Sequence, residues 1–172
     1  MDLKIIKRYD IIKKVWKEYK FMNIFDLPYI NEIDAKNSNP QLLAFIGDAV
    51  FSLYIRHKVV LENKEKIKEL HSHTTHFVKA SEQSLFSDKL HKIYNEEELA
   101  VFRRARNYKT ANIAKNAKLS DYKKATGFEA VLGYLYLSGK IDRLNELLKE
   151  CEDENWRKEC CFWNITKWEQ RG

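Results

Sequence analysis

The ten residues LLAFIGDAVF at positions 42–51 decide the fold class of this 172-residue chain. They are apolar or small except for Asp48, and the apolar pattern continues to about Leu61, which predicts one long, largely buried helix. The whole chain has only five glycines and two prolines, which argues against a loop-rich β protein. We therefore expect an all-α fold, with further helices over about residues 3–20, 64–92, 96–107, 120–137 and 141–151.

Local signals indicate where two of these helices begin. Ser38 or Asn39 can cap the first, Pro40 fits its first turn, and Gln41 would complete a capping box with Ser38. Asn95 is followed by three glutamates, and the dipole of a helix favours acids in its first turn. A second helix is therefore expected to start directly after Asn95.

Positive charge is concentrated in one part of the chain. The net charge is +6, and residues 103–124 carry eight lysines and arginines with a single acid. This segment therefore holds more net positive charge than the whole chain. Such a pattern is typical of a surface that binds a polyanion, and by itself it does not distinguish RNA, DNA or a membrane surface. A solvated helix face could have the same composition, so the charge alone leaves both interpretations open.

Two acids stand in otherwise apolar helices. Asp48 shares its helical stripe with small or polar residues, and Glu129 shares its stripe with Ala125 and Gly133. Because the neighbouring side chains on each stripe are small, a ligand has room to reach each carboxylate. A buried carboxylate needs a cation, a metal ion or water as its partner, so the pair is a candidate for Mg²⁺ ligation. Two acids that simply face solvent are the alternative.

The cysteines and histidines do not indicate a metal centre. All three cysteines lie in the tail over residues 151–172, and Cys160-Cys161 lacks the spacing of zinc ligands. His71 and His73 would point to different faces of a helix. No apolar run approaches the ~18 residues of a membrane span, and the first residues do not resemble a signal peptide. We expect a cytoplasmic protein without a membrane partner.

The segments FIGDAVF at 45–51 and FEAVLGYLYL at 128–137, in this order, resemble the two signature helices of the ribonuclease III catalytic domain. The chain is more similar still to the mini-ribonuclease III family, through features that lie between the two helices: Val78-Lys79-Ala80, Gln83, Arg106-Asn107-Tyr108-Lys109 and Lys115-Asn116.

The resemblance implies three parts. Residues 37–150 would form the ribonuclease III-like helical bundle, which works as a homodimer. Residues 1–36 would be an N-terminal helical extension, and residues 151–172 a Trp/Cys-rich tail. Independently of the resemblance, the loss of periodicity from residue 21 to 39, together with Pro28, indicates a linker there. No separate double-stranded-RNA-binding domain is expected, so the catalytic domain must hold its own substrate. We expect part of the dimer seam near Asp48, at Phe45, Phe51 and Tyr54.

The activity implied by the resemblance is that of a Mg²⁺-dependent endoribonuclease. It would cut double-stranded RNA, leave 5′-phosphate ends and mature the ends of the 23S ribosomal RNA precursor, with a ribosomal protein as a candidate further partner. Asp48 and Glu129 would be both the catalytic residues and the metal ligands. The expected RNA contacts come from the basic segment: Arg103, Arg104, Arg106, Asn107, Lys109, Lys115 and Lys118.

Two positions depart from full-length ribonuclease III. Those enzymes have a glutamate four residues before the signature aspartate and an aspartate three residues before the second glutamate, where this chain has Ala44 and Thr126. Fewer acidic residues are therefore available as metal ligands, and the number of metal ions stays open. These departures favour the alternative of a non-catalytic helical module that binds structured RNA. A third hypothesis is an adaptor that holds a protein partner through its tail.

Overall fold

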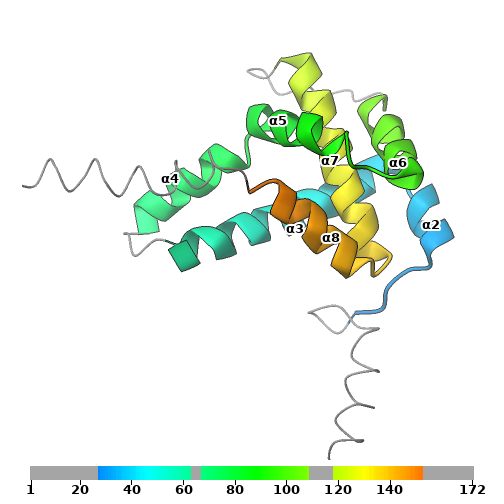
Figure 1. Cartoon of the computed structure of the whole chain (residues 1–172), viewed down its shortest axis with the longest axis horizontal. Helices are drawn as coiled ribbons and strands as arrows, with labels where there is room; N and C mark the ends of the chain where they lie inside the picture. The colour runs from blue at the N-terminus through cyan, green and yellow to red at the C-terminus, as the bar shows by residue number, and fades with distance from the viewer. Residues whose placement is uncertain (1–26, 63–66, 109–117, 153–172) are drawn as a thin grey trace, which may run out of the picture.

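The computed structural model describes residues 27–62, 67–108 and 118–152, and all the regular elements in these ranges are helices (Figure 1). The all-α prediction is confirmed for them, and within them no helix is long and apolar enough to cross a bilayer. The helix predicted over 3–20 and the tail beyond residue 152 lie outside the described residues. The elements are α2 (Glu32–Asn37), α3 (Pro40–Glu62), α4 (Ile67–Phe77), α5 (Ala80–Leu90), α6 (Glu96–Arg106), α7 (Leu119–Leu137) and α8 (Ile141–Glu150).

Helix α7 forms the centre of the bundle, with α3, α5, α6 and α8 packed around it (Figure 1). Its residues 130–135 are buried without a break, as expected for a helix covered on every side. Phe128 of α7 meets Phe51 of α3 edge to face, with ring centroids 5.0 Å apart, and Phe86 of α5 joins the same cluster. Each such ring pair contributes about 0.5–1.5 kcal/mol beyond the burial of its area.

This cluster corrects one expectation about the dimer seam. Phe51 is fully buried inside the domain, so it is a core residue and its assignment to an exposed seam is wrong. Tyr54 is half-buried and its hydroxyl donates to Glu152, whereas Phe45 is 74% exposed. Three aromatic residues of one helix therefore have three different environments, because they point in different directions around α3.

The start of α3 is capped differently from the expected arrangement. Asn39 Oδ1 accepts a hydrogen bond from the backbone N of Gln41 at 2.9 Å, while the Ser38 hydroxyl donates back to a carbonyl of α2. Asn39 is therefore the capping residue, and the predicted Ser38–Gln41 capping box is wrong. A capping box forms instead at the start of α6, where Asn95 and Glu98 exchange backbone-to-side-chain hydrogen bonds of 2.9 Å.

Helix α2 occupies part of the segment expected to be a linker. Asn31 Oδ1 accepts from the backbone N of Asp34 at 2.9 Å and caps this helix, and Ala35 is fully buried in the core. The linker prediction is wrong for residues 32–37. Six residues are too few to display a helical period, so the element could not be recognised from its pattern.

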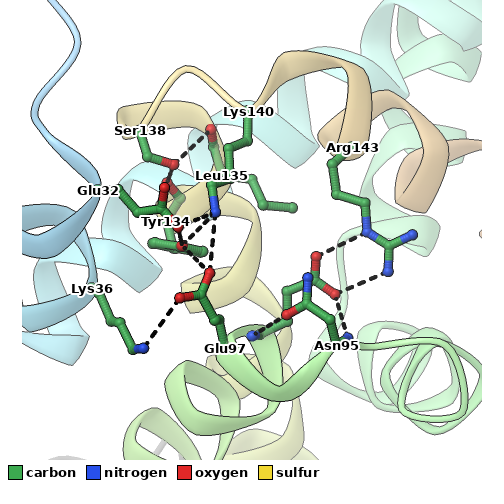
Figure 2. Close-up of polar contacts among 10 residues, drawn as sticks. Glu32, Lys36, Asn95, Glu97, Tyr134, Leu135, Ser138, Lys140 and Arg143 are labelled. Carbon is green, nitrogen blue, oxygen red and sulfur yellow. Dashed lines mark hydrogen bonds and ion pairs between the residues drawn. The ribbon is translucent and has the colours of Figure 1, made fainter.

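A polar network joins the ends of α2, α6, α7 and α8 (Figure 2). Lys140 Nζ donates to the Glu97 carboxylate at 3.2 Å, to Tyr134 Oη at 3.0 Å and to the Glu32 carboxylate. Lys36 Nζ pairs with the other oxygen of Glu97 at 3.3 Å. Since these residues come from distant parts of the chain, the network fixes one end of the bundle. We refer to Glu32, Lys36, Glu97, Tyr134 and Lys140 as the polar network.

Next to the polar network, a fully buried glutamate is neutralised by an arginine. Glu98 has no exposed surface, and Arg143 donates from Nε to Oε1 at 2.9 Å and from Nη2 to Oε2 at 3.0 Å (Figure 2). Arg143 Nη2 also donates to the carbonyl of Ile93 at 2.7 Å. The buried charge thus has a bidentate partner, which is the condition under which a protein tolerates it.

Candidate active site

Two glycines bring the signature helices into backbone contact. A Cβ added to Gly47 of α3 would lie 1.7 Å from the carbonyl oxygen of Glu129, and one added to Gly133 of α7 would lie 2.0 Å from the carbonyl oxygen of Leu43. No larger residue fits at either position, so α3 and α7 cross with main chain against main chain. Asp48 directly follows Gly47, and it therefore sits next to Glu129 although 81 positions separate them in the sequence.

The two acids interact electrostatically. Burial, and then the charge of Asp48, raise the pKa of Glu129 from 4.5 to about 8, against a smaller lowering effect of the Gln83 side chain. Asp48 is exposed and Glu129 is half-buried, so the pair opens to solvent on the Asp48 side. A carboxylate with a raised pKa next to a second acid is typical of a cation-binding site, because a divalent ion would favour the charged form of both acids.

The donor set fits Mg²⁺. Carboxylate oxygens are the ligands that Mg²⁺ prefers, and this ion is commonly held by one or two carboxylates while it keeps several waters. Among the residues that the structure describes, no three or more histidines, cysteines and acids are arranged so that they could hold a metal ion. Ala44 is buried in the core, and the Thr126 hydroxyl donates to the carbonyl of Tyr122 at 3.0 Å. The positions that differ from full-length ribonuclease III therefore add no acid to the pair.

The described part of the basic segment lies on α6 and at the start of α7. Arg103 and Lys118 are exposed, and Asn107 is the exposed C-cap residue of α6. The Arg106 guanidinium lies 5.8 Å from the centre of the Phe102 ring, and its Nε donates to Asn107 Oδ1 at 3.3 Å. These side chains are accessible to an anion. Lys109 and Lys115 lie outside the described residues.

Arg104 has a structural role in the fold. Its Nη2 donates to the carbonyl of Ser38 at 3.0 Å and to that of Lys36, so it joins α6 to the C-terminal end of α2. The side chain is half-buried. A phosphate contact by Arg104 stays a prediction. Its guanidinium is engaged by backbone carbonyls within the domain, whereas Arg103 is exposed.

One polar residue near the acids had no role assigned from the sequence. Gln83 of α5 is 1% exposed and lies beside Glu129, whose pKa it lowers. A usable signal was present, because Gln83 shares a helical stripe with Phe86, Ser87 and Leu90, all of which are buried. A glutamine on a buried stripe predicts a specific polar partner.

A separate hollow of about 430 Å³ lies between α3 and α8. It is lined by Tyr54, Lys58, Asn145, Lys149 and Glu152, and contains neither member of the acid pair. Lys58 Nζ forms an ion pair with Glu152 at 2.8 Å on its wall.

Known proteins match the part of the chain that carries the two acids. The family model of the ribonuclease III domain matches residues 41–140, a range that contains both acids. The chain is 49% identical over 117 residues to the mini-ribonuclease 3 of Clostridium tetani, covering 67% of this chain and 78% of that one. It is 44% identical over 111 residues to the mini-ribonuclease 3 of Thermoanaerobacter sp., covering 64% of this chain and 78% of that one.

A solved structure supports the fold. The crystal structure of protein FN1578 from Fusobacterium nucleatum has a TM-score of 0.61 and 31% identity, covering 67% of this chain and 93% of that one. The helical bundle, the match to the family model and the similarity to these relatives together show a ribonuclease III-type endoribonuclease. Within that class, the chain belongs to the mini-ribonuclease 3 family.

Proposed function

We propose that this protein is a Mg²⁺-dependent endoribonuclease that cuts double-stranded RNA, leaves 5′-phosphate ends and matures the ends of the 23S ribosomal RNA precursor. The observation that carries the proposal is the acid pair: the α3–α7 crossing puts Asp48 beside Glu129, where burial and the charge of Asp48 raise the pKa of Glu129. The resemblance of the sequence to the mini-ribonuclease III family supports the choice of RNA.

The two acids have different tasks in this mechanism. Asp48 is exposed and offers its carboxylate on the side that a phosphodiester can approach, while Glu129 is held deeper by the packing of α7. Both would hold Mg²⁺, directly or through water. When bound, the ion makes water a better nucleophile for in-line attack on phosphorus and stabilises the leaving 3′ oxygen. The rigid crossing of the two helices keeps the carboxylates in place for this chemistry.

RNA binding would rely on the shape and the charge of the duplex. A-form RNA offers phosphates and 2′-hydroxyls across a wide minor groove, so most contacts need no base recognition. Arg103, Arg106, Asn107 and Lys118 are the described candidates for these contacts, and their accessible positions support the assignment. Lys109 and Lys115 complete the proposed set.

A second copy of the chain would pack along α3. The exposed side of this helix carries Leu42, Phe45 and Leu53 at helical spacing, an apolar stripe that includes the neighbours of Asp48. A two-fold partner would cover this stripe and put a second acid pair along the same surface. We expect Phe45→Glu to halve the mass measured by light scattering, while Leu85→Glu, the same change at an exposed apolar residue of α5, leaves it unaltered. A dimeric Phe45→Glu variant would contradict the proposed seam.

The decisive experiment is a cleavage assay on the full chain. Duplex RNA that contains the paired ends of the 23S precursor is incubated with Mg²⁺ or with EDTA, beside an unrelated duplex and a single strand. Cuts in the duplexes that require Mg²⁺ and expose phosphatase-sensitive 5′ ends support the proposed chemistry. Faster cutting of the precursor supports the proposed substrate.

The alternative, a non-catalytic module that binds structured RNA, is favoured by the small number of acids at the site. It predicts a different result in the same assay: the duplex is bound, and the RNA stays intact in Mg²⁺. The adaptor hypothesis concerns the tail, which lies outside the described residues.

A further inference from the structure

Gln83 is a buried amide at the acid pair. It lies on α5, which packs against α7, and only 1% of its surface is exposed. Its neighbours along the same stripe, Phe86 and Leu90, belong to the hydrophobic core. A long polar side chain in such surroundings has to find a hydrogen-bond partner, since burying an unpaired amide is unfavourable.

The Glu129 carboxyl lies close enough to this amide for the two groups to interact. Among the groups that shift the pKa of Glu129, burial and Asp48 raise it and the Gln83 side chain lowers it, as a donor to the charged carboxylate would. Gln83 Nε2 nevertheless completes no hydrogen bond of full distance and angle with any residue that the structure describes. The amide therefore lies against Glu129 with donor capacity left over.

We propose that Gln83 is a positioning residue: its Nε2 donates to one oxygen of Glu129 and turns the other oxygen toward Asp48 for a divalent cation. This inference rests on the proposed function of the acid pair. The donor restricts the rotation of the Glu129 carboxylate, so that the ligand geometry exists before the ion arrives. Partners of metal ligands commonly act in this way.

The chemistry of an amide suits this task. A lysine or arginine at position 83 would also donate to Glu129, but its positive charge would neutralise the site and compete with the cation. An amide orients the carboxylate and leaves the full charge of both acids available to a divalent ion. Neither Ala44, which has no polar group, nor Thr126, whose hydroxyl donates within α7, can supply this donor.

The test replaces the amide and keeps the volume. Gln83→Met removes the donor, and Ser87→Ala is the matched control, because Ser87 is equally buried one turn further along α5 and its Oγ also has no partner among the described residues. The binding of Mn²⁺ to the full chain is measured by electron paramagnetic resonance without RNA. Single-turnover cleavage is measured over a range of Mg²⁺ and RNA concentrations.

We expect Gln83→Met to weaken Mn²⁺ binding by about 10- to 100-fold and to raise the Mg²⁺ requirement for cleavage by a similar factor. The KM for RNA should stay within about twofold, since Gln83 does not reach the surface. Ser87→Ala should match the wild type in every measurement. A purely structural role for Gln83 would lower the melting temperature and leave the metal affinity of the folded fraction unchanged.

Two results would overturn the proposal. One is Mn²⁺ binding by folded Gln83→Met within about threefold of the wild type, and the other is an equal loss in Ser87→Ala. If the Met variant does not fold, Gln83→Leu is measured in the same way. Failure of the proposed function gives a different result. In that case the wild-type chain itself cuts no RNA, or it shows no Mn²⁺ binding that is lost when Asp48 is replaced.

Discussion

The acid pair and the polar network shift the pKa of a glutamate in opposite directions. At the acid pair, burial and then the charge of Asp48 raise the pKa of Glu129 to about 8. In the polar network, hydrogen bonds, first of all the one from Lys140, lower the pKa of Glu97 to about 2. Glu129 and Tyr134 are five residues apart on the same helix, so α7 serves both regions. Glu97 thus has lysine partners, whereas the described groups that shift the pKa of Glu129 include no cation.

The largest effect should come from removing one charge at the acid pair. Asp48→Asn keeps the volume but loses an anionic ligand, so we expect cleavage to fall at least a thousandfold, or about 4 kcal/mol in the activation barrier. Folding and RNA binding should stay nearly intact, because Asp48 is exposed. Asp142→Asn, an exposed acid at the start of α8, serves as the control. Cleavage by Asp48→Asn within about tenfold of the wild type would remove Asp48 from the mechanism.

A matching change beside the polar network should affect stability instead. Arg143→Met leaves Glu98 buried and without its bidentate partner, which should lower the free energy of unfolding by about 3 kcal/mol. Urea unfolding followed by circular dichroism measures this loss. The cleavage rate per folded molecule should be unchanged. A variant that keeps its stability but loses cleavage would contradict the separation of the two regions.

The pH dependence of stability should tell the two carboxylates apart. The pKa of Glu129 in the folded chain is about 8 against an ordinary value of 4.5, so the native state binds this proton more tightly than the unfolded chain. The resulting stabilisation is complete below pH 4.5 and is lost as the pH rises through about 8. Without metal, we expect a loss of about 4 kcal/mol between pH 5 and pH 8.5 that is absent in Glu129→Gln.

Glu97 should show the reverse dependence. Its folded pKa is lowered, so its contribution is present above pH 4.5 and is lost as the pH falls toward 2. Unfolding curves of Glu97→Gln below pH 4 check this expectation. An identical pH profile for the two glutamine variants would mean that the contrast between the regions has no thermodynamic consequence.

The smallest effect concerns the basic segment. Replacing Arg106, Lys109 and Lys115 together should weaken binding of duplex RNA and reduce the slope of log affinity against log salt by about one for each phosphate that is no longer neutralised. Cleavage at saturating RNA should change much less. Lys149→Ala, on α8, is a control of the same charge type. An unchanged slope would mean that the basic segment is only a solvated surface.

Most of the fold could be predicted because the helices have strong local signals. The long apolar pattern of α3 and the position of Asn95 before α6 agree with the structure to within a residue or two. Helix α2 was missed since its stability comes from one cap and from Ala35 in the core. The choice of Asn39 over Ser38 as a cap was also undecided, because both residues can accept the same hydrogen bonds and only the backbone geometry selects one.

The sequence by itself determined the helical class and the family, since these depend on residue types at fixed spacings, and it made the two acids candidates for the site. Only the tertiary structure decided which groups share a site. Gly47 and Gly133 show no special pattern until α3 and α7 cross through them, and Gln83 is one of several polar residues of α5 until it lies against Glu129. Contacts between distant segments depend on how the helices pack, and packing is a property of the whole core that no local spacing contains.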